Sequence, residues 1–214
     1  GAFQFTALTA ITVPSTVKVI KAFAFNKIGS LATVTFPSNS VLETIGSYAF
    51  FGTALTAITV PSTVKLIDQY AFSSCSKLAT VTFPSNSVLE TIGQYAFQKT
   101  ALTTITVPST VKLIDQYAFN SCSKLATVIV SCASIITINS DAFASSGVAS
   151  LSIPSAVTYT GSVARNTITS CSLCAVGKYS ASGDDSSGAC SNPGSGNCAA
   201  TLALGATTCS TAVG

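Results

Sequence analysis

The side chains of this sequence that are best suited to chemistry are its eight cysteines, because thiolates form disulfides and bind metals. Five of them lie after residue 170, in a Ser- and Gly-rich stretch whose weak apolar periodicity cannot build a core. Together with an earlier cysteine they make an even set, which predicts three disulfides formed in an oxidising compartment. Six cysteines allow fifteen pairings, and the sequence does not choose among them. The set comprises Cys132, Cys171, Cys174, Cys190, Cys198 and Cys209.

A zinc site is the alternative for Cys171-x-x-Cys174, because two cysteines at this spacing often share a metal. The chain has no histidine and no second C-x-x-C pair, so the usual four ligands of zinc are incomplete. The absence of histidine also removes the commonest general base. We therefore expect neither a metal nor a cofactor.

Carboxylates recur in two pairs, Glu43 with Glu90 and Asp68 with Asp115. If the chain stacks in coils, the members of each pair lie two coils, or about 10 Å, apart. That separation matches the two carboxyl groups of an inverting glycosidase. Repetition of the sequence explains the pairs without any cleft, so we expect no enzymatic activity.

Two nearly identical blocks of 47 residues, 26–72 and 73–119, hold these side chains in place. Each block consists of two coils that close on a phenylalanine, with successive spacings of 22, 25, 22, 25, 22 and 24 residues. Within each coil, a run of type L-x-x-I/V-x-V/F, usually ended by proline, predicts one short parallel strand. The closing residues are Phe3, Phe25, Phe50, Phe72, Phe97, Phe119 and Phe143.

This pattern predicts a right-handed solenoid of seven coils over residues 1–157, in which each coil packs only on its neighbours. Residues 158–214 form the Ser/Gly/Cys-rich remainder. We expect this segment to be a loop-rich cap on the last coil, stabilised by its disulfides. Cys132 lies in a turn of the repeats and would tie the cap to the solenoid.

The coil sequence resembles the Treponema-type, or BspA-like, leucine-rich repeats. Their pattern, C-x-x-L-x-x-I-x-L-P-x-x-L-x-x-I-G-x-x-A-F, is matched by SSCSKLATVTFPSNSVLETIGQYAF at 73–97. The resemblance implies a leucine-rich-repeat solenoid in a secreted or surface-exposed protein that serves adhesion rather than catalysis. The stretch CSLCAVGKYSASG at 171–183 resembles the cysteine-rich, ephrin-receptor-like repeats of eukaryotic extracellular proteins, which also implies secretion.

The remaining two cysteines, Cys75 and Cys122, occupy the same position in two coils, three residues after the closing phenylalanine. Two coils apart is about 10 Å. A disulfide needs Cα atoms within about 7 Å, so these two cannot pair with each other. We therefore expect both to be free thiols buried in the core.

Two rows of side chains would line the outside of the solenoid. Threonines on the strands could reflect β-propensity, carry O-glycans, pack against another subunit or form an ice-binding plane. A row of aromatic residues could stack on sugars or on one another. The threonine row is Thr12, Thr33, Thr35, Thr59, Thr80, Thr82, Thr104 and Thr106. The aromatic row, which we call the aromatic stripe, is Phe23, Tyr48, Tyr70, Tyr95 and Tyr117.

The composition narrows the function further. Charged residues make up 8% of the chain and the net charge is +3, which is too small and too scattered for nucleic-acid binding. No apolar run of about 18 residues is present, so we expect no membrane span. More than a quarter of the residues are Ser or Thr, which suits O-glycosylation of an extracellular protein.

The chain opens at Gly1 inside a repeat, so its first coil would present an uncapped strand edge. Another copy stacking head to tail on that edge would produce a filament. We therefore expect an extracellular, O-glycosylated, non-enzymatic structural protein that assembles into a filament or surface layer. The alternative is a cell-surface adhesin or ligand-binding leucine-rich-repeat module, with glycans or cell-surface proteins as partners. Ice binding is a third interpretation.

Overall fold

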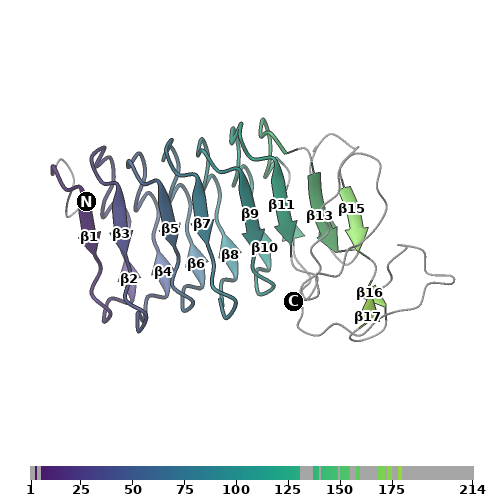
Figure 1. Ribbon diagram of the computed structural model, residues 1–214, viewed down its shortest axis with the longest axis horizontal. Coiled ribbons are helices and arrows are strands. Elements are labelled where there is room, and N and C mark those ends of the chain that lie inside the picture. Colours follow the sequence, from purple (N-terminus) through teal and green to yellow (C-terminus); the bar gives the residue numbers. More distant parts are fainter. Residues whose placement is uncertain are drawn as a thin grey trace.

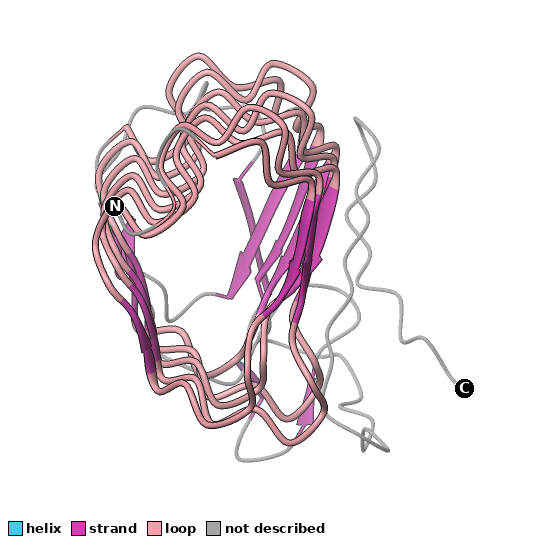
Figure 2. Cartoon of the chain, turned by 90° about the vertical axis from the view of Figure 1, so that its left-hand side faces the viewer, coloured by secondary structure: helices cyan, strands magenta, loops and turns pink. Residues whose placement is uncertain are grey.

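The computed structural model is a solenoid in which successive coils of chain stack in sequence order (Figure 1). It describes residue 3, residues 6–130, 137–139 and 141–148, and the backbone of the strands that follow. No helix occurs in this part of the chain. A view along the stack shows the strands on two opposite walls, joined by turns (Figure 2).

The first wall consists of long strands, which lie where the L-x-x-I/V-x-V/F runs predicted strands. In β1, β3, β5 and β7 the central residue points inward and its two neighbours point outward, and the four residues of β9 alternate in the same way, as the two-residue period of a strand requires. Neighbours that pair do so in parallel. The long strands are β1 (Ala10–Thr12), β3 (Thr33–Thr35), β5 (Ala57–Thr59), β7 (Thr80–Thr82), β9 (Thr104–Val107), β11 (Thr127–Val130), β13 (Ser150–Pro154) and β15 (Ile168–Cys171).

The opposite wall adds a second strand to each coil, where the sequence predicted only one. These strands have two residues each and form one continuous, parallel, seven-stranded sheet. Two residues are too few to show an alternating pattern, which is why these strands were not predicted. The short strands are β2 (Val19–Ile20), β4 (Thr44–Ile45), β6 (Leu66–Ile67), β8 (Thr91–Ile92), β10 (Leu113–Ile114), β12 (Thr137–Ile138) and β14 (Thr158–Tyr159).

Both walls continue beyond residue 157, where we expected the solenoid to give way to the cap. β14 pairs in parallel with β12, and β15 pairs in parallel with β13. After them, β16 (Leu173–Cys174) and β17 (Lys178–Tyr179) pair antiparallel to each other. The position of the boundary stays a prediction.

The core is a stack of equivalent side chains, one layer per coil. The closing phenylalanines Phe25 to Phe143 are buried, and adjacent rings stack with centroids 5.1–5.4 Å apart and planes within 8°. This separation is close to the spacing of paired strands, about 4.8 Å, so ring stacking and strand pairing support the same coil rise. Leucine, isoleucine and valine columns fill the rest of the layer.

The wall of long strands is not continuous. β1 pairs with β3, and β5 pairs with β7, but no strand pairing joins β3 to β5 or β7 to β9. Val13 and Val60, which follow the strands of the shorter coils, donate backbone hydrogen bonds of 3.0 Å to Thr35 and Thr82 of the next coil. Phe36, at the equivalent position of a longer coil, donates no such bond. The strand pairing therefore follows the same 47-residue period, but it joins each shorter coil to the longer coil that follows, so β3 and β5 of one sequence block are not paired.

Candidate functional site

Alternating turn lengths produce a groove at the end of the long strands. The turn after β3 runs from 36 to 43 and the turn after β7 from 83 to 90, whereas the turn after β5, at 60–65, is two residues shorter. The short turn therefore forms a floor between two longer turns. The resulting groove has a volume of about 590 Å³ and is lined by 34–38, Ser40, 57–62, Thr82, Pro84 and Asn86. We call it the turn groove.

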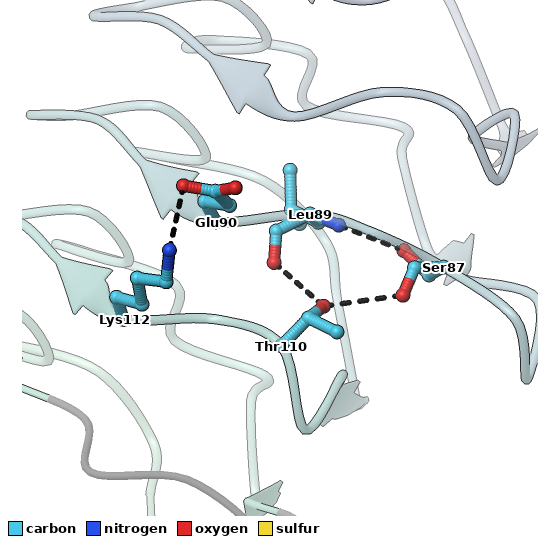
Figure 3. A network of polar contacts seen from close by, with 5 residues as sticks. All are labelled: Ser87, Leu89, Glu90, Thr110 and Lys112. Atoms are coloured by element: carbon cyan, nitrogen blue, oxygen red, sulfur yellow. Dashed lines mark hydrogen bonds and ion pairs between the residues drawn. The ribbon is translucent and has the colours of Figure 1, made fainter.

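A threonine in each short turn holds neighbouring turns together where the strand pairing is interrupted. Thr63 Oγ1 donates to the carbonyl oxygens of Ser40 and Leu42, at 3.2 and 2.7 Å. Thr110 makes the same two bonds, to Ser87 and Leu89, one block later (Figure 3). Because side-chain bonds replace the missing backbone bonds, the turn groove has a fixed floor.

All eight threonines of the predicted row lie exposed on the outer side of β1, β3, β5, β7 and β9. No charged residue occurs in these five strands. The turn groove gathers Thr35, Thr59 and Thr82 along its inner end, and the other five lie outside it. The structure thus brings three of the eight threonines together in the turn groove. We call the complete row of eight the threonine face.

The aromatic stripe is stacked on itself. Neighbouring rings from Phe23 to Tyr117 are 4.6–4.9 Å apart and within 12° of parallel. Every member has a positive φ, between 56° and 60°, in a turn that recurs in each coil. Because the faces of the inner rings are already covered by neighbours, those rings offer edges to a partner and no free surface for stacking on a sugar. Of the two possibilities given for the aromatic stripe, stacking on sugars or stacking of the rings on one another, the structure has the second.

The recurring carboxylates connect one coil to the next. Glu90 accepts a hydrogen bond of 3.0 Å from Lys112 Nζ (Figure 3), and Glu43 lies 4.0 Å from Lys65 Nζ. On the same wall, Asp68 accepts a hydrogen bond of 2.6 Å from the hydroxyl of Ser47. Asp115 accepts one of 2.7 Å from the side-chain amide of Asn139. The exposed ion pairs contribute little stability, about 0–1 kcal/mol each.

Cys75 and Cys122 are buried, unpaired thiols in equivalent environments. The Sγ atom of Cys75 donates to the carbonyl oxygen of Phe50 at 3.0 Å and lies 3.2 Å from the hydroxyl of Thr53. Cys122 has the same two contacts, with Phe97 and Thr100. Burial raises the pKa of the Cys75 thiol to about 11 and also raises the pKa of Cys122.

The raised pKa of Cys75 predicts a loss of stability at alkaline pH. Between its unfolded value near 9 and its folded value of about 11, the unfolded chain releases the thiol proton while the folded chain keeps it. The free energy of unfolding should therefore be unaffected by this group below pH 9 and fall as pH rises from 9 to 11, by about 3 kcal/mol in all. Urea titrations at each pH measure the fall, which should be smaller in Cys75→Ala. Equal slopes in both proteins would contradict the assignment.

The six cysteines predicted to form disulfides lie outside the residues whose side chains the structure describes. Cys171 and Cys174 are placed by their backbone alone, at the ends of β15 and β16. Cys132, Cys190, Cys198 and Cys209 lie outside the described residues. Their pairing stays a prediction. Within the described residues, no cluster of three or more His, Cys, Asp or Glu side chains could hold a metal ion.

The turn groove is the feature that sequence reasoning missed. Its signal was present in the turn sequences, since FPSNSVLE at 36–43 alternates with VPSTVK at 60–65. The alternation of 22- and 25-residue spacings was noticed, but a spacing alone does not say which turn carries the extra residues. The positions of the strands show that two of the extra residues of each longer coil lie in the turn next to the threonine face.

The comparisons with known proteins identify the repeats. A family described as BspA type leucine rich repeat region matches residues 1–126 and 43–174. No curated protein matches the chain. The described part of the chain contains no helix with the length and hydrophobicity that a membrane span requires.

Three similar crystal structures are bacterial leucine-rich repeat proteins. The protein from Bacteroides ovatus is 27% identical with a TM-score of 0.55, over 72% of this chain and 45% of its own length. The T. pallidum protein is 26% identical with a TM-score of 0.51, over 75% of this chain and 72% of its own. The Eubacterium ventriosum protein, at 24% identity and a TM-score of 0.58, shares the fold over 73% of this chain and 44% of its own.

This chain therefore spans less than half the length of two of these relatives. The family match covers most of the chain, including the residues that form the stacked coils of the structure. The chain belongs to the BspA type leucine-rich repeat family.

Proposed function

We propose that this chain is an extracellular, non-enzymatic repeat module that recognises a partner at a cell surface through its threonine face. The observation that carries the proposal is a row of exposed hydroxyl groups on five uncharged strands, continuous with the turn groove. A rigid stack of coils holds these hydroxyls in register, so a partner would meet a preorganised surface. Some of the same hydroxyls are candidates for O-glycans.

A neutral, hydroxyl-rich face favours a partner that is itself neutral and polar. Hydroxyl groups both donate and accept hydrogen bonds, so they suit glycans and uncharged protein surfaces. A charged partner would find no counter-charge on these strands. The recurring carboxylates are engaged between coils, which supports a scaffold rather than an enzyme.

Assembly into a filament is a second candidate, favoured by an apolar surface at the end of the first coil. Phe3, Ile11, Val19 and Phe25 line a hollow of about 370 Å³ there. Phe3 and Val19 are 40% and 48% exposed. Another copy, stacked head to tail, would cover these side chains by extending the core. Coils preceding Gly1 in a longer chain would cover them equally well.

Replacing Thr59, Thr82 and Thr106 by Lys tests recognition by the threonine face. We expect binding to glycan-bearing eukaryotic cells, measured by flow cytometry, to fall by about tenfold or more. The matched control changes Ala22, Gln69 and Gln116 to Lys, because these residues share one repeat position just before the aromatic stripe. Unchanged binding by the threonine variant would contradict recognition by this face. Analytical ultracentrifugation of both variants measures assembly separately, and a wild-type chain that stays monomeric would contradict the filament.

A further inference from the structure

We propose that the turn groove is a binding site for a short, neutral oligosaccharide. The inference rests on the proposed function, because it names the kind of partner that the threonine face receives. It goes further in placing the ligand at one site, between the turns 36–43 and 83–90 and above the turn 60–65.

The size of the turn groove suits a ligand of this kind. Its volume of about 590 Å³ lies within the range of about 300–1,000 Å³ that small-ligand clefts occupy. The two longer turns form its walls and the shorter turn its floor, so the space is a consequence of the alternating coils. Thr63 fixes the floor by bonding to the wall carbonyls of Ser40 and Leu42.

The lining combines polar groups and compact apolar surfaces without any charge. The hydroxyls of Thr35, Thr59 and Thr82 lie at the inner end, and Asn86 adds a side-chain amide. Three proline rings, Pro37, Pro61 and Pro84, line the walls and the floor. A sugar presents hydroxyls that donate and accept hydrogen bonds and a C–H face that packs on such rings, whereas an ion would find no counter-charge.

Main-chain groups add further hydrogen-bonding capacity at the inner end. In a parallel sheet, alternate residues direct their N–H and C=O groups to opposite neighbours. Thr33 and Thr35 bond to the coil of β1, so Val34 faces β5. Ile58 faces β7, so Ala57 and Thr59 face β3. No strand pairing joins β3 to β5, so the hydroxyls of a bound sugar would supply partners to the main-chain groups that face each other there.

The same arrangement disfavours an added peptide strand. β-Strand addition requires a free sheet edge with open space beside it. Here the two unpaired edges face each other, because β3 and β5 are successive strands of one wall (Figure 1). A ligand with separate hydroxyl groups can reach such sites one at a time, which an extended peptide cannot.

The test is titration of the isotope-labelled full chain with maltotriose, cellotriose and mannotriose, followed by NMR. We expect at least one trisaccharide to shift the amide signals of residues 34–38 and 57–62, apart from Pro37 and Pro61, which have no amide proton. Thr59→Lys, which places a charged side chain in the groove, should weaken that binding by about tenfold or more. The matched control is Thr80→Lys, because Thr80 is equally exposed on the neighbouring strand but does not line the groove.

The other outcomes distinguish failure of the inference from failure of the proposed function. Binding that is unaffected by Thr59→Lys, or equally weakened by Thr80→Lys, would place the sugar elsewhere. A neutral extended peptide that shifts the same signals while no trisaccharide does would replace the oligosaccharide by a peptide. If no probe binds but the chain still binds cells through its threonine face, the inference fails while the proposed function stands. If the Lys variant of Thr59, Thr82 and Thr106 binds cells as well as the wild-type chain does, while trisaccharide binding to the turn groove is intact, the proposed function fails and the inference stands.

Discussion

A Phe97→Ala variant is expected to lose about 3–5 kcal/mol of its free energy of unfolding, the loss typical of deleting a buried aromatic ring. Phe97 is fully buried, and its ring stacks between Phe72 and Phe119 at 5.3 and 5.4 Å. Removal of the ring leaves a cavity in the middle of the column and breaks two stacking contacts at once. Urea denaturation followed by circular dichroism measures the loss.

The consequence should extend beyond one coil, because the coils of a solenoid are stabilised by their neighbours alone. A gap at Phe97 weakens the interfaces on both of its sides, so we expect the unfolding transition to broaden as the two halves unfold separately. The matched control is Phe23→Ala. Phe23 is 43% exposed and, among the described residues, its ring stacks only on Tyr48, so its removal should lower the free energy of unfolding by about 1 kcal/mol. Equal losses in the two variants would contradict a core held by the phenylalanine column.

The regularity of this column explains why so much of the fold was predictable. Repetition allows seven copies of the same pattern to be compared within one chain, so an irregular residue in one copy does not obscure the others. The outward threonines of the long strands, such as Thr33 and Thr59, followed from a pattern that recurs along the repeats. The places of Cys75 and Cys122 followed from their shared distance to the closing phenylalanine.

The features that escaped prediction depend on relations between coils rather than on the sequence within one coil. Leu66 and Ile67 form a strand only because Thr44 and Ile45 on one side and Thr91 and Ile92 on the other present matching backbone groups. The turn groove likewise exists because a short turn lies between two long ones. A pattern search along the chain considers each turn by itself and does not compare the lengths of turns that lie side by side in neighbouring coils.

The orientation of the rings in the aromatic stripe is another feature that depends on neighbouring coils. Its spacing was correctly recognised, yet spacing could not say whether the rings offer faces or edges. The structure resolves this through ring planes that are nearly parallel and 4.6–4.9 Å apart. A row of tyrosines that would suit sugar stacking if the rings were separated is instead part of the stacking within the solenoid.

The glycine of the recurring Ile-Gly pair gives the second large prediction. A Cβ atom on Gly93 would lie 2.9 Å from the carbonyl carbon of Asp68 and from the backbone nitrogen of Gln69 in the preceding coil. These are backbone atoms of the segment that follows β6, where the backbone N–H of Asp68 donates a hydrogen bond to the carbonyl oxygen of Ile45 in the preceding coil, and they cannot move aside without disturbing the stack. Gly93→Ala should therefore lower the free energy of unfolding by about 2–3 kcal/mol, the upper part of the range for overpacking.

The alternation of coils makes this prediction specific. Gly46 and Gly93 belong to the longer coils, while Asp68 holds the equivalent position in the shorter coil between them and carries a Cβ. At this repeat position, the close approach occurs at Gly46 and Gly93, where a longer coil stacks on a shorter one. The matched control is Gly29→Ala, since a Cβ there meets no atom within 4 Å, and the variant should keep or gain about 0.4–1 kcal/mol by restricting the unfolded chain. If urea denaturation shows equal stability for both variants, the coils approach each other less closely at Gly93 than the solenoid requires.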